Sequence, residues 1–364
     1  MNNLEQSVKV TSKVIKILYL YNYENWAIHN VGKLWLNNQA LIDVTYKKES
    51  ALKIDDFRRY DFIWFGYLDL YVNYYLKRHL SSFEKNKCIV SIHDPLELFP
   101  EKKNWKSLGP PSFKLTNIDN WGKHTKLKLL SEVHNIVTAS LEMQKTLSKY
   151  QLHTYVIPTT SLLNSRSKDQ IKTTKCSLTS IYEIYPRKNI SLMDEIKKYC
   201  FKNKIKFDTK VGKKILSDDD YAKLLDSHEI YICTSYQEGG PLPAMDAMKR
   251  GEVVITTPVG QLQEIIKDGE NGYICNSGAE FDRRINELSN DLKLLNQLRI
   301  KSLESINSKR DINNIRKNVI AYLTNVTESP EQTHSKEPNP YKLDSCTTST
   351  FQSHPYKIDD ITKM

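Results

Sequence analysis

Apolar runs alternate with amphipathic stretches along the first half of the chain. Four runs are rich in β-branched and aromatic residues, at 14–21, 61–65, 88–92 and 135–138. Each run is continuous rather than alternating, which is typical of parallel strands covered by helices on both faces. Between the first two runs, residues 26–38 carry Ile28, Val31, Leu34 and Trp35 at helical spacing. This pattern predicts an α/β domain built on a doubly wound parallel sheet.

A second series of the same kind follows an irregular segment. Residues 155–175 lose the periodicity and collect Ser, Thr and Lys, which predicts a connection between two domains. Strands are expected at 178–185, 229–234 and 253–257, and helical spacing returns at 288–298 and 312–323. We therefore divide the chain into a first domain (1–155), a linker (156–175), a second domain (176–325) and a tail (326–364).

The tail is polar and contains four prolines, so we expect it to be flexible. One peptide recurs in it: Pro-Tyr-Lys-Leu-Asp at 340–344 returns as Pro-Tyr-Lys-Ile-Asp at 355–359. A repeated peptide on a flexible tail can act as a bivalent docking motif. Chance or a recent duplication explains the repeat equally well.

Composition narrows the class of protein without giving a function. The chain of 364 residues is long enough for two cores, and its longest apolar runs are too short to cross a bilayer. The N-terminus lacks the layout of a secretion signal, and the six cysteines are scattered without a CxxC pair. These features predict a cytosolic protein with reduced thiols.

The net charge of +10 favours a polyanionic partner: an acidic membrane face, a phosphorylated acceptor or nucleic acid. A lysine-rich composition gives the same balance with no partner at all. Because the sequence contains no nucleic-acid recognition module, we expect no nucleic-acid ligand. Peripheral contact with an acidic inner membrane face stays open.

The segment 230–274 carries the candidate chemistry. Its loop Glu238-Gly239-Gly240-Pro241 follows the carboxyl end of a predicted strand, where doubly wound sheets bind ligands. Glycines let backbone amides approach an anion, and the following helix, 243–250, adds its positive N-terminus. Asp246 lies roughly one turn inside that helix. We expect it and Glu238, an exposed loop carboxylate, to face one bound molecule from the two edges of this loop.

The same segment resembles a known signature. In order, the matching residues are Ser235, Glu238-Gly239, Asp246-Ala247-Met248, Gly251, Val253-Val254, Pro258-Val259-Gly260, Glu264-Ile265-Ile266 and residues 268–272. This series resembles the C-terminal signature of the family-four retaining glycosyltransferases (glycosyl transferases group 1) and is more specific than a lone glycine motif. The resemblance implies a GT-B fold: two Rossmann-like doubly wound domains facing a cleft, with the donor in the second domain and the acceptor mainly in the first.

By the same resemblance, Glu238 contacts the transferred sugar and is catalytic, while Asp246 contacts the ribose of the donor. The family usually has glutamate at the second position, so Asp246 is a departure that shortens the reach by one methylene. The loop residues Gly239, Gly240 and Pro241 are expected to bind the donor as well.

Residues 181–189 resemble the family's first strand and loop of the donor domain, where an arginine and a lysine bind the diphosphate. Lys188 falls on the lysine position, but Glu183 occupies the arginine position. The adjacent Arg187 can supply the missing charge, because a planar guanidinium suits a diphosphate. The alternative is that Arg187 and Lys188 form a solvated loop.

The first domain matches the family more weakly. His93-Asp94 ends a predicted strand where similar enzymes often carry a His-Asp pair facing the cleft. His93 is therefore a second catalytic candidate, with a structural histidine as the alternative. The loop 22–26 lacks the glycine pair common in the family. Altogether the resemblance covers residues 14–325.

No metal or cofactor is expected beyond the nucleotide-sugar substrate. Asp218-Asp219-Asp220 resembles the acidic metal motif of a different glycosyltransferase fold, but Ser217 precedes it and helical spacing follows. This order predicts a helix N-cap with acidic residues in the first turn. Cations and a helix N-terminus would neutralise the diphosphate.

The resemblance thus implies a hexosyltransferase that moves a sugar from a nucleotide-diphosphate donor to a glycan or lipid-linked acceptor, with retention of configuration, in polysaccharide biosynthesis. Two alternatives are another GT-B activity, such as an epimerase or a phosphorylase, and a non-catalytic sugar-nucleotide-binding subunit of a glycan assembly complex. Glu183 and Asp246 are the departures that motivate the second alternative.

Overall fold

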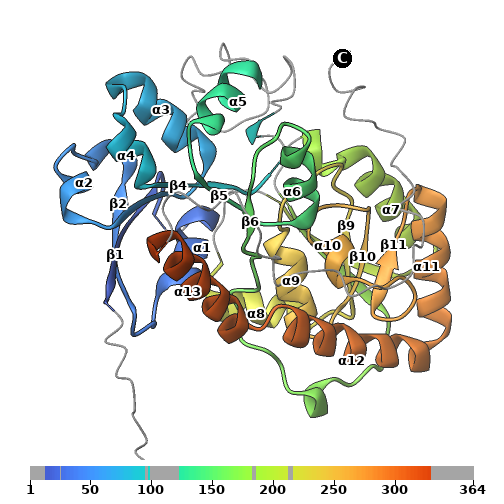
Figure 1. The fold of residues 1–364 in the computed structure, drawn as a ribbon. Coiled ribbons are helices and arrows are strands. Elements are labelled where there is room, and N and C mark those ends of the chain that lie inside the picture. Colours follow the sequence, from blue (N-terminus) through green and yellow to red (C-terminus); the bar gives the residue numbers. More distant parts are fainter. Residues whose placement is uncertain are drawn as a thin grey trace, which may run out of the picture.

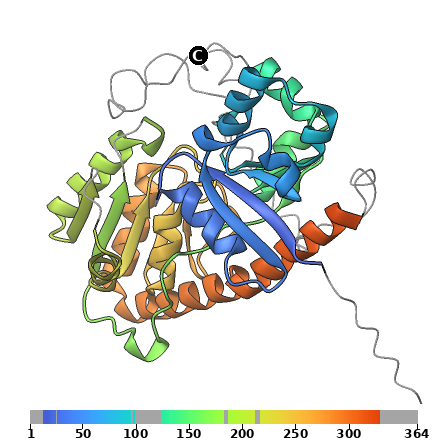
Figure 2. The same ribbon diagram turned by 90° about the vertical axis from the view of Figure 1, so that its left-hand side faces the viewer.

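In a computed structural model the chain forms two α/β domains, each built on one parallel sheet (Figures 1 and 2). The structure describes residues 13–328 apart from residues 25, 95–96, 99–122, 183–185 and 212–215. Residues 329–364 of the predicted tail, with its repeated peptide, and Glu183 lie outside the described residues. None of the helices in the described ranges is long and apolar enough to cross a bilayer.

The first sheet has the strand order β2-β1-β3-β4-β5-β6, all parallel. Its strands are β1 (Ile15–Tyr21), β2 (Ile42–Lys48), β3 (Phe62–Phe65), β4 (Cys88–Ile92), β5 (Asn135–Thr138) and β6 (Tyr155–Val156). The second sheet has the order β11-β10-β9-β7-β8 and is also parallel. Its strands are β7 (Ser177–Tyr182), β8 (Lys206–Val211), β9 (Ile230–Cys233), β10 (Val253–Thr256) and β11 (Gly272–Ile274). In both sheets the first strand lies between the second and the third, so the order reverses beside it.

Helices cover both faces of each sheet. In the first half they are α1 (Ala27–Leu36), α2 (Asp56–Arg59), α3 (Leu68–Arg78), α4 (Ser82–Asn86), α5 (Lys123–Ser131) and α6 (Leu141–Ser148). In the second half they are α7 (Ile190–Lys202), α8 (Asp218–Asp226), α9 (Leu242–Lys249), α10 (Leu262–Ile265), α11 (Gly278–Asn290), α12 (Leu292–Lys309) and α13 (Ile312–Glu328). Short 3₁₀ turns lie at Glu49–Ala51, Lys168–Gln170 and Pro186–Lys188. The predicted fold class, two doubly wound domains, is confirmed.

Serine and aspartate side chains fix several of these helix starts. Ser217 Oγ accepts a hydrogen bond from the backbone N–H of Asp220 at 3.1 Å, so α8 begins as the sequence predicted. Asp291 caps α12 by accepting from Leu294 N at 2.8 Å. This cap divides the helical spacing at 288–298 into two helices, α11 and α12, where the periodicity alone predicted one.

The last helix leaves the second domain and packs on the first. Figure 1 shows α12 and α13 running in sequence from the second domain to a position against α1. Ile315, Val319 and Leu323 of α13 are buried in the same apolar cluster as Trp35 of α1 and Trp64 of β3. The predicted boundary assigned residues up to 325 to the second domain, whereas these side chains complete the core of the first.

A polar joint fixes the two domains to each other near the start of α10. Gln261 accepts from Thr159 N at 3.2 Å and donates to Thr159 Oγ1 at 2.9 Å. Glu264 accepts from Leu141 N of the first domain at 2.8 Å and from Arg310 at 2.8 Å. Because these groups are buried or partly buried and mutually hydrogen-bonded, the joint holds the cleft-facing loops in one arrangement.

Candidate active site

Two loops at the carboxyl edge of the second sheet carry most of the predicted site residues. One loop follows β7 and leads through Pro186–Lys188 into α7, and the other follows β9 and leads into α9. β7 and β9 are neighbours at the point where the strand order reverses. Open α/β sheets bind their ligands in the crevice at this point.

Backbone contacts join the two loops. Tyr236 N donates to the carbonyl of Arg187 at 2.7 Å, and Thr234 Oγ1 donates to the carbonyl of Lys188 at 2.8 Å. Asn189, in the left-handed conformation with φ 51°, then caps α7 by accepting from Leu192 N. Arg187 and Lys188 therefore stand at the positive end of a 13-residue helix, an arrangement suited to an anion.

Glu238 is buried, which corrects the expectation of an exposed loop carboxylate. Its exposed fraction is 6%. The carboxylate contacts Lys188 Nζ, lies 3.8 Å from Arg187 Nη1 and accepts a hydrogen bond from Ser235 Oγ at 2.7 Å. Two cations and a hydroxyl replace the water that this carboxylate loses, so its burial is tolerated.

The same contacts keep Glu238 ionised. Burial by itself raises the pKa of this carboxyl, but the ammonium of Lys188 and the guanidinium of Arg187 outweigh it, so the pKa of Glu238 lies below its ordinary value. The carboxylate is consequently a hydrogen-bond acceptor at neutral pH. Such a group can accept bonds from the hydroxyls of a sugar.

The paired glycines serve the contact between domains. A Cβ on Gly239 would lie 1.8 Å from the carbonyl oxygen of His93 in the first domain. A Cβ on Gly240 would lie 2.5 Å from Thr159 Oγ1 and 2.4 Å from Gln261 Nε2. Glycine is thus required here for close approach across the cleft, a reason that the sequence pattern did not reveal. Pro241 follows as the N-cap of α9.

His93 turns its ring into the first domain and its backbone toward the donor loop. The imidazole Nε2 lies 2.8 Å from the carbonyl of Gly66, and the ring stacks on Trp35 with centroids 5.6 Å apart. Burial lowers the pKa of His93 to about 4, so the ring is neutral at pH 7. Since a carbonyl only accepts, Nε2 carries the hydrogen and Nδ1 is an acceptor.

Asp94 reaches across the cleft to the second domain. Its Oδ2 lies 2.6 Å from Arg187 Nη1, and the two side chains are 15% and 24% exposed. The carboxylate of Glu97 holds this loop by accepting from the backbone N–H groups of His93 at 2.7 Å and Asp94 at 3.1 Å. Asp94 thereby joins the charge cluster around Glu238.

Asp246 is also buried, and its contacts lead away from Glu238. Its Oδ1 accepts from Ser161 Oγ at 2.6 Å and from Leu162 N at 3.0 Å, and its Oδ2 accepts from Tyr221 OH at 3.0 Å. Burial raises the pKa of Asp246 above its ordinary value, although these hydrogen bonds act in the opposite direction. In this arrangement the carboxylate joins α9 to the linker and to α8.

The three consecutive aspartates at 218–220 lie at a helix start. No group of three or more His, Cys, Asp or Glu side chains in the ranges that the structure describes is arranged to hold a metal ion. Asp218, Asp219 and Asp220 occupy the first turn of α8 behind the Ser217 cap. They stabilise the helix N-terminus through its dipole.

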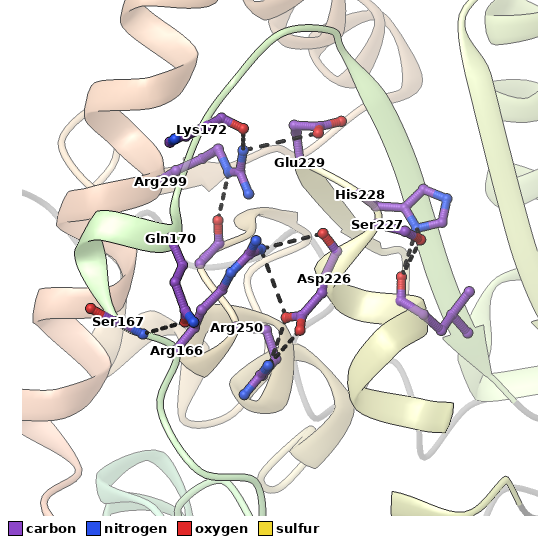
Figure 3. A network of polar contacts seen from close by, with 12 residues as sticks. Arg166, Ser167, Gln170, Lys172, Asp226, Ser227, His228, Glu229, Arg250 and Arg299 are labelled. Carbon is purple, nitrogen blue, oxygen red and sulfur yellow. Dashed lines mark hydrogen bonds and ion pairs between the residues drawn. The ribbon is translucent and has the colours of Figure 1, made fainter. Parts of the chain in front are cut away.

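A second charged cluster lies at the amino edge of the same sheet (Figure 3). The buried Arg299 donates to the carbonyls of Gly251 at 2.7 Å and Lys172 at 3.2 Å and lies 3.9 Å from Glu229. Arg250 forms an ion pair with Asp226, in which Nε donates to Oδ1 at 2.7 Å. A solvent-open cavity of about 450 Å³ borders the cluster; it is lined by Arg166, Asp169, Gln170, Lys172, Asp226 and Arg250.

Glu252 belongs to this second cluster but is bonded differently. It is fully buried beside the first residue of β10, and neither carboxylate oxygen accepts a hydrogen bond from the described part of the chain. Burial raises the pKa of Glu252 far above its ordinary value; Glu229 and Asp226 add to this and Arg299 opposes it. The side chain is therefore held as the neutral acid over a wide pH range.

Sequence reasoning named some partners of the site only in passing and missed others. The sequence indicates Asp94 only as part of the pair with His93, and Ser235 only as part of the signature, without a role for either. No pattern points to Ser161 or Tyr221, because one lies in the predicted linker and the other 25 positions from Asp246. The available signal is that Asp246 is one methylene shorter than the family's glutamate. A shorter side chain needs hydrogen-bond partners close to its own backbone.

A family model matches part of the second domain. Residues 186–304, about a third of the chain, match the family model described as Glycosyl transferases group 1. The matched segment contains both loops of the site, and it confirms the resemblance predicted from the sequence. No curated protein matches the chain in sequence.

Solved structures match over most of the chain. HepE from Anabaena, in complex with UDP and glucose, has a TM-score of 0.58 at 14% identity, covering 85% of this chain and 99% of its own. Sucrose-phosphate synthase from Thermosynechococcus elongatus has a TM-score of 0.60 at 13% identity, covering 86% and 100%. A glycosyltransferase from Rickettsia africae has a TM-score of 0.54 at 12% identity, covering 85% of this chain and 98% of its own. These similarities show that the fold is GT-B.

Proposed function

Since residues 186–304 match the family model of the group 1 glycosyl transferases, we propose that this protein is a hexosyltransferase that uses a nucleotide-diphosphate sugar. The observation that carries the proposal is the buried, ionised Glu238 between Lys188, Arg187 and Ser235 at the carboxyl edge of the second sheet. The sugar passes to a glycan or lipid-linked acceptor with retention of anomeric configuration. HepE, one structural neighbour, was solved with UDP-glucose.

In this proposal the diphosphate of the donor binds Arg187 and Lys188 at the N-terminus of α7. As the bond between sugar and phosphate breaks, negative charge grows on the leaving diphosphate, and the two cations stabilise it. Glu238, released from part of its ion pairing, accepts hydrogen bonds from the transferred sugar and orients its anomeric carbon. Asp246 binds the ribose through the remaining acceptor capacity of Oδ2.

The first domain supplies the acceptor side. His93 lies beside the donor loop through its backbone carbonyl, which lies against Gly239, and its neutral ring offers Nδ1 as a hydrogen-bond acceptor on the side of the first domain. Closure of the domains at this contact excludes water, so that transfer to an acceptor hydroxyl is favoured over hydrolysis of the donor. The basic net charge of +10 fits a lipid-linked acceptor at an acidic membrane face, where the protein would bind peripherally.

The test is a donor panel. UDP-, GDP- and ADP-linked hexoses are incubated with the purified protein and a mixture of mono- and oligosaccharide acceptors, with and without EDTA, and the released nucleoside diphosphate is measured. We expect one base and one sugar to be preferred, saccharide as the product with its anomeric configuration retained by NMR, and no effect of EDTA.

Three other outcomes contradict parts of the proposal. Release of free sugar or of sugar phosphate in place of a saccharide indicates an epimerase or a phosphorylase. Binding of donor without turnover by the isolated protein indicates a non-catalytic subunit. A strict, reversible requirement for Mn²⁺ or Mg²⁺ contradicts the metal-independent mechanism.

A further inference from the structure

Four charged side chains meet where the two domains face each other. Asp94 comes from the first domain, and Arg187, Lys188 and Glu238 come from the second. The carboxylate of Asp94 contacts Arg187 Nη1 at 2.6 Å, whereas Glu238 lies 3.8 Å from the same nitrogen. The two cations are thus balanced by two carboxylates, and one of these belongs to the opposite domain.

Because both cations already have carboxylate partners, an anion that enters the site must compete with these carboxylates. A diphosphate that takes Arg187 must displace Asp94 from it or remain beside a like charge. The Asp94 and Arg187 side chains are 15% and 24% exposed, so the pair is accessible to such an exchange. Glu238 differs, because it is only 7% exposed and keeps Lys188 and Ser235 as partners.

The loop that carries Asp94 is held in place independently of Arg187. One oxygen of Glu97 accepts from the backbone N–H groups of His93 and Asp94, and the other accepts from Leu68 N at the start of α3, at 2.9 Å. The backbone of Asp94 therefore stays at the domain boundary when Arg187 moves to another partner. Its carboxylate then remains in the cleft as a fixed negative charge.

We propose that Asp94 determines the donor affinity of this site by competing with the donor diphosphate for Arg187. Without donor, Asp94 forms an ion pair with Arg187 and so links the two domains. When the diphosphate binds, Arg187 is transferred to it, and Asp94 gives up this ion pair. The inference rests on the proposed function, since it requires that the ligand of Arg187 and Lys188 is a diphosphate.

Calorimetric titration of the full chain tests this competition without knowledge of the acceptor. The probes are UDP, inorganic pyrophosphate, which carries no base, and uridine, which carries no charge. Asp94→Asn and Asp94→Ala should bind UDP and pyrophosphate about tenfold more tightly than wild type, because a like charge next to the ligand is removed. Uridine affinity should not change.

Asp61→Asn is the matched control. Asp61 is also an ion-paired aspartate of the first domain, bonded to Lys13 at 3.0 Å and to Lys16 N at 2.9 Å, and its removal changes the net charge equally. We expect its affinity for all three probes to equal that of wild type. A residue with only a structural role would weaken binding when removed, so tightening is a readout specific to competition.

Each remaining outcome overturns the inference. In one outcome, wild type binds UDP or pyrophosphate, and the Asp94 variants bind them equally well or more weakly. This result overturns the role of Asp94 and leaves the proposed function intact. Equal tightening for uridine or in Asp61→Asn shows that the effect is not competition for Arg187. Wild type that binds neither UDP nor pyrophosphate overturns the inference and the proposed function together.

Discussion

The second sheet carries a charged cluster at each end, and the two clusters are built differently. At the carboxyl edge, Arg187 and Lys188 have carboxylate partners on loops, one of them in the opposite domain. At the amino edge, Arg299 is held by backbone carbonyls within the second domain and the linker, and its side chain is 1% exposed. A ligand can take over side-chain partners at a domain boundary more readily than it can reach Arg299, whose side chain is almost fully buried. The first cluster is therefore suited to binding and the second to stability.

Glu238→Gln should have the largest effect and should act on turnover. The carboxamide keeps the bond from Ser235 but loses the ionic contacts that place the acceptor oxygens. We expect turnover of the preferred donor to fall by at least about a hundredfold, as misplacement of reacting groups typically costs. Release of nucleoside diphosphate gives the rate, and the melting temperature reports on the fold.

Glu229→Gln is the control for this change, since it makes the same substitution at the amino edge. Glu229 accepts from Ser177 N at 2.9 Å and Oγ at 2.7 Å and lies far from the donor loops in the fold. Its turnover per folded molecule should equal that of wild type. Turnover of Glu238→Gln within a fewfold of wild type would remove Glu238 from the site.

Arg299→Met should act on stability instead. It leaves the buried Glu229 without its cation and removes the hydrogen bonds to the carbonyls of Gly251 and Lys172, which typically costs about 3–5 kcal/mol of unfolding free energy. Urea titration measures the loss, and the UDP affinity of the folded variant should be unchanged. Arg283→Met on the exposed side of α11 should be nearly neutral. An Arg299 variant as stable as wild type would contradict the structural role of this cluster.

Asp246→Ala should lose both stability and nucleotide affinity. Ser161, Leu162 N and Tyr221 lose their common acceptor, at a cost of about 1–3 kcal/mol. Asp246→Glu should also lower stability, because an extra methylene enters a filled, buried position. Tyr221→Phe separates the two effects.

Tyr221→Phe removes one hydrogen bond, at about 1 kcal/mol, and leaves Oδ2 of Asp246 free for the ribose. Its affinity for UDP should be equal to or higher than that of wild type in calorimetric titration. If Asp246→Ala binds UDP as tightly as wild type, Asp246 has a structural role alone and the donor is held by Arg187, Lys188 and the glycine loop.

Glu252→Gln should show its effect in the pH dependence of stability and not in donor binding or turnover. The pKa of Glu252 is raised in the folded state, so its stabilising contribution is complete below its ordinary value of about 4.5 and is lost as pH rises toward the folded pKa. Glutamine has no such loss. The difference in unfolding free energy should therefore favour the variant increasingly from pH 5 to pH 8. Parallel pH profiles of the two proteins would contradict the raised pKa.

The sequence predicted the interior of each sheet but not its edges. The strands that periodicity identified are β1, β3, β4, β5, β7, β9 and β10, and the four that it missed are β2, β6, β8 and β11. All four missed strands occupy the ends of the two sheets. An edge strand is covered less completely and carries polar residues, as in Ile42–Lys48 with its two lysines, so it lacks the continuous apolar signal.

The site was predictable as a motif but not as a set of contacts. The signature located the donor loop and its glycines, because those features lie within ten residues. Lys188, a partner of Glu238, lies 50 positions from it in the sequence, and Ser161, a partner of Asp246, lies 85 positions from it. Burial of a carboxylate depends on such distant partners, so Glu238 was expected to be exposed.

The return of α13 to the first domain has a consequence for synthesis of the chain on the ribosome. Domains generally fold in the order in which they are made. Here the first domain lacks Ile315, Val319 and Leu323 of its core until the second domain has been translated in full. The second sheet, made from one continuous segment, is complete earlier. The domain made first is thus the last to be finished, and until then its bare apolar face is a natural binding site for chaperones.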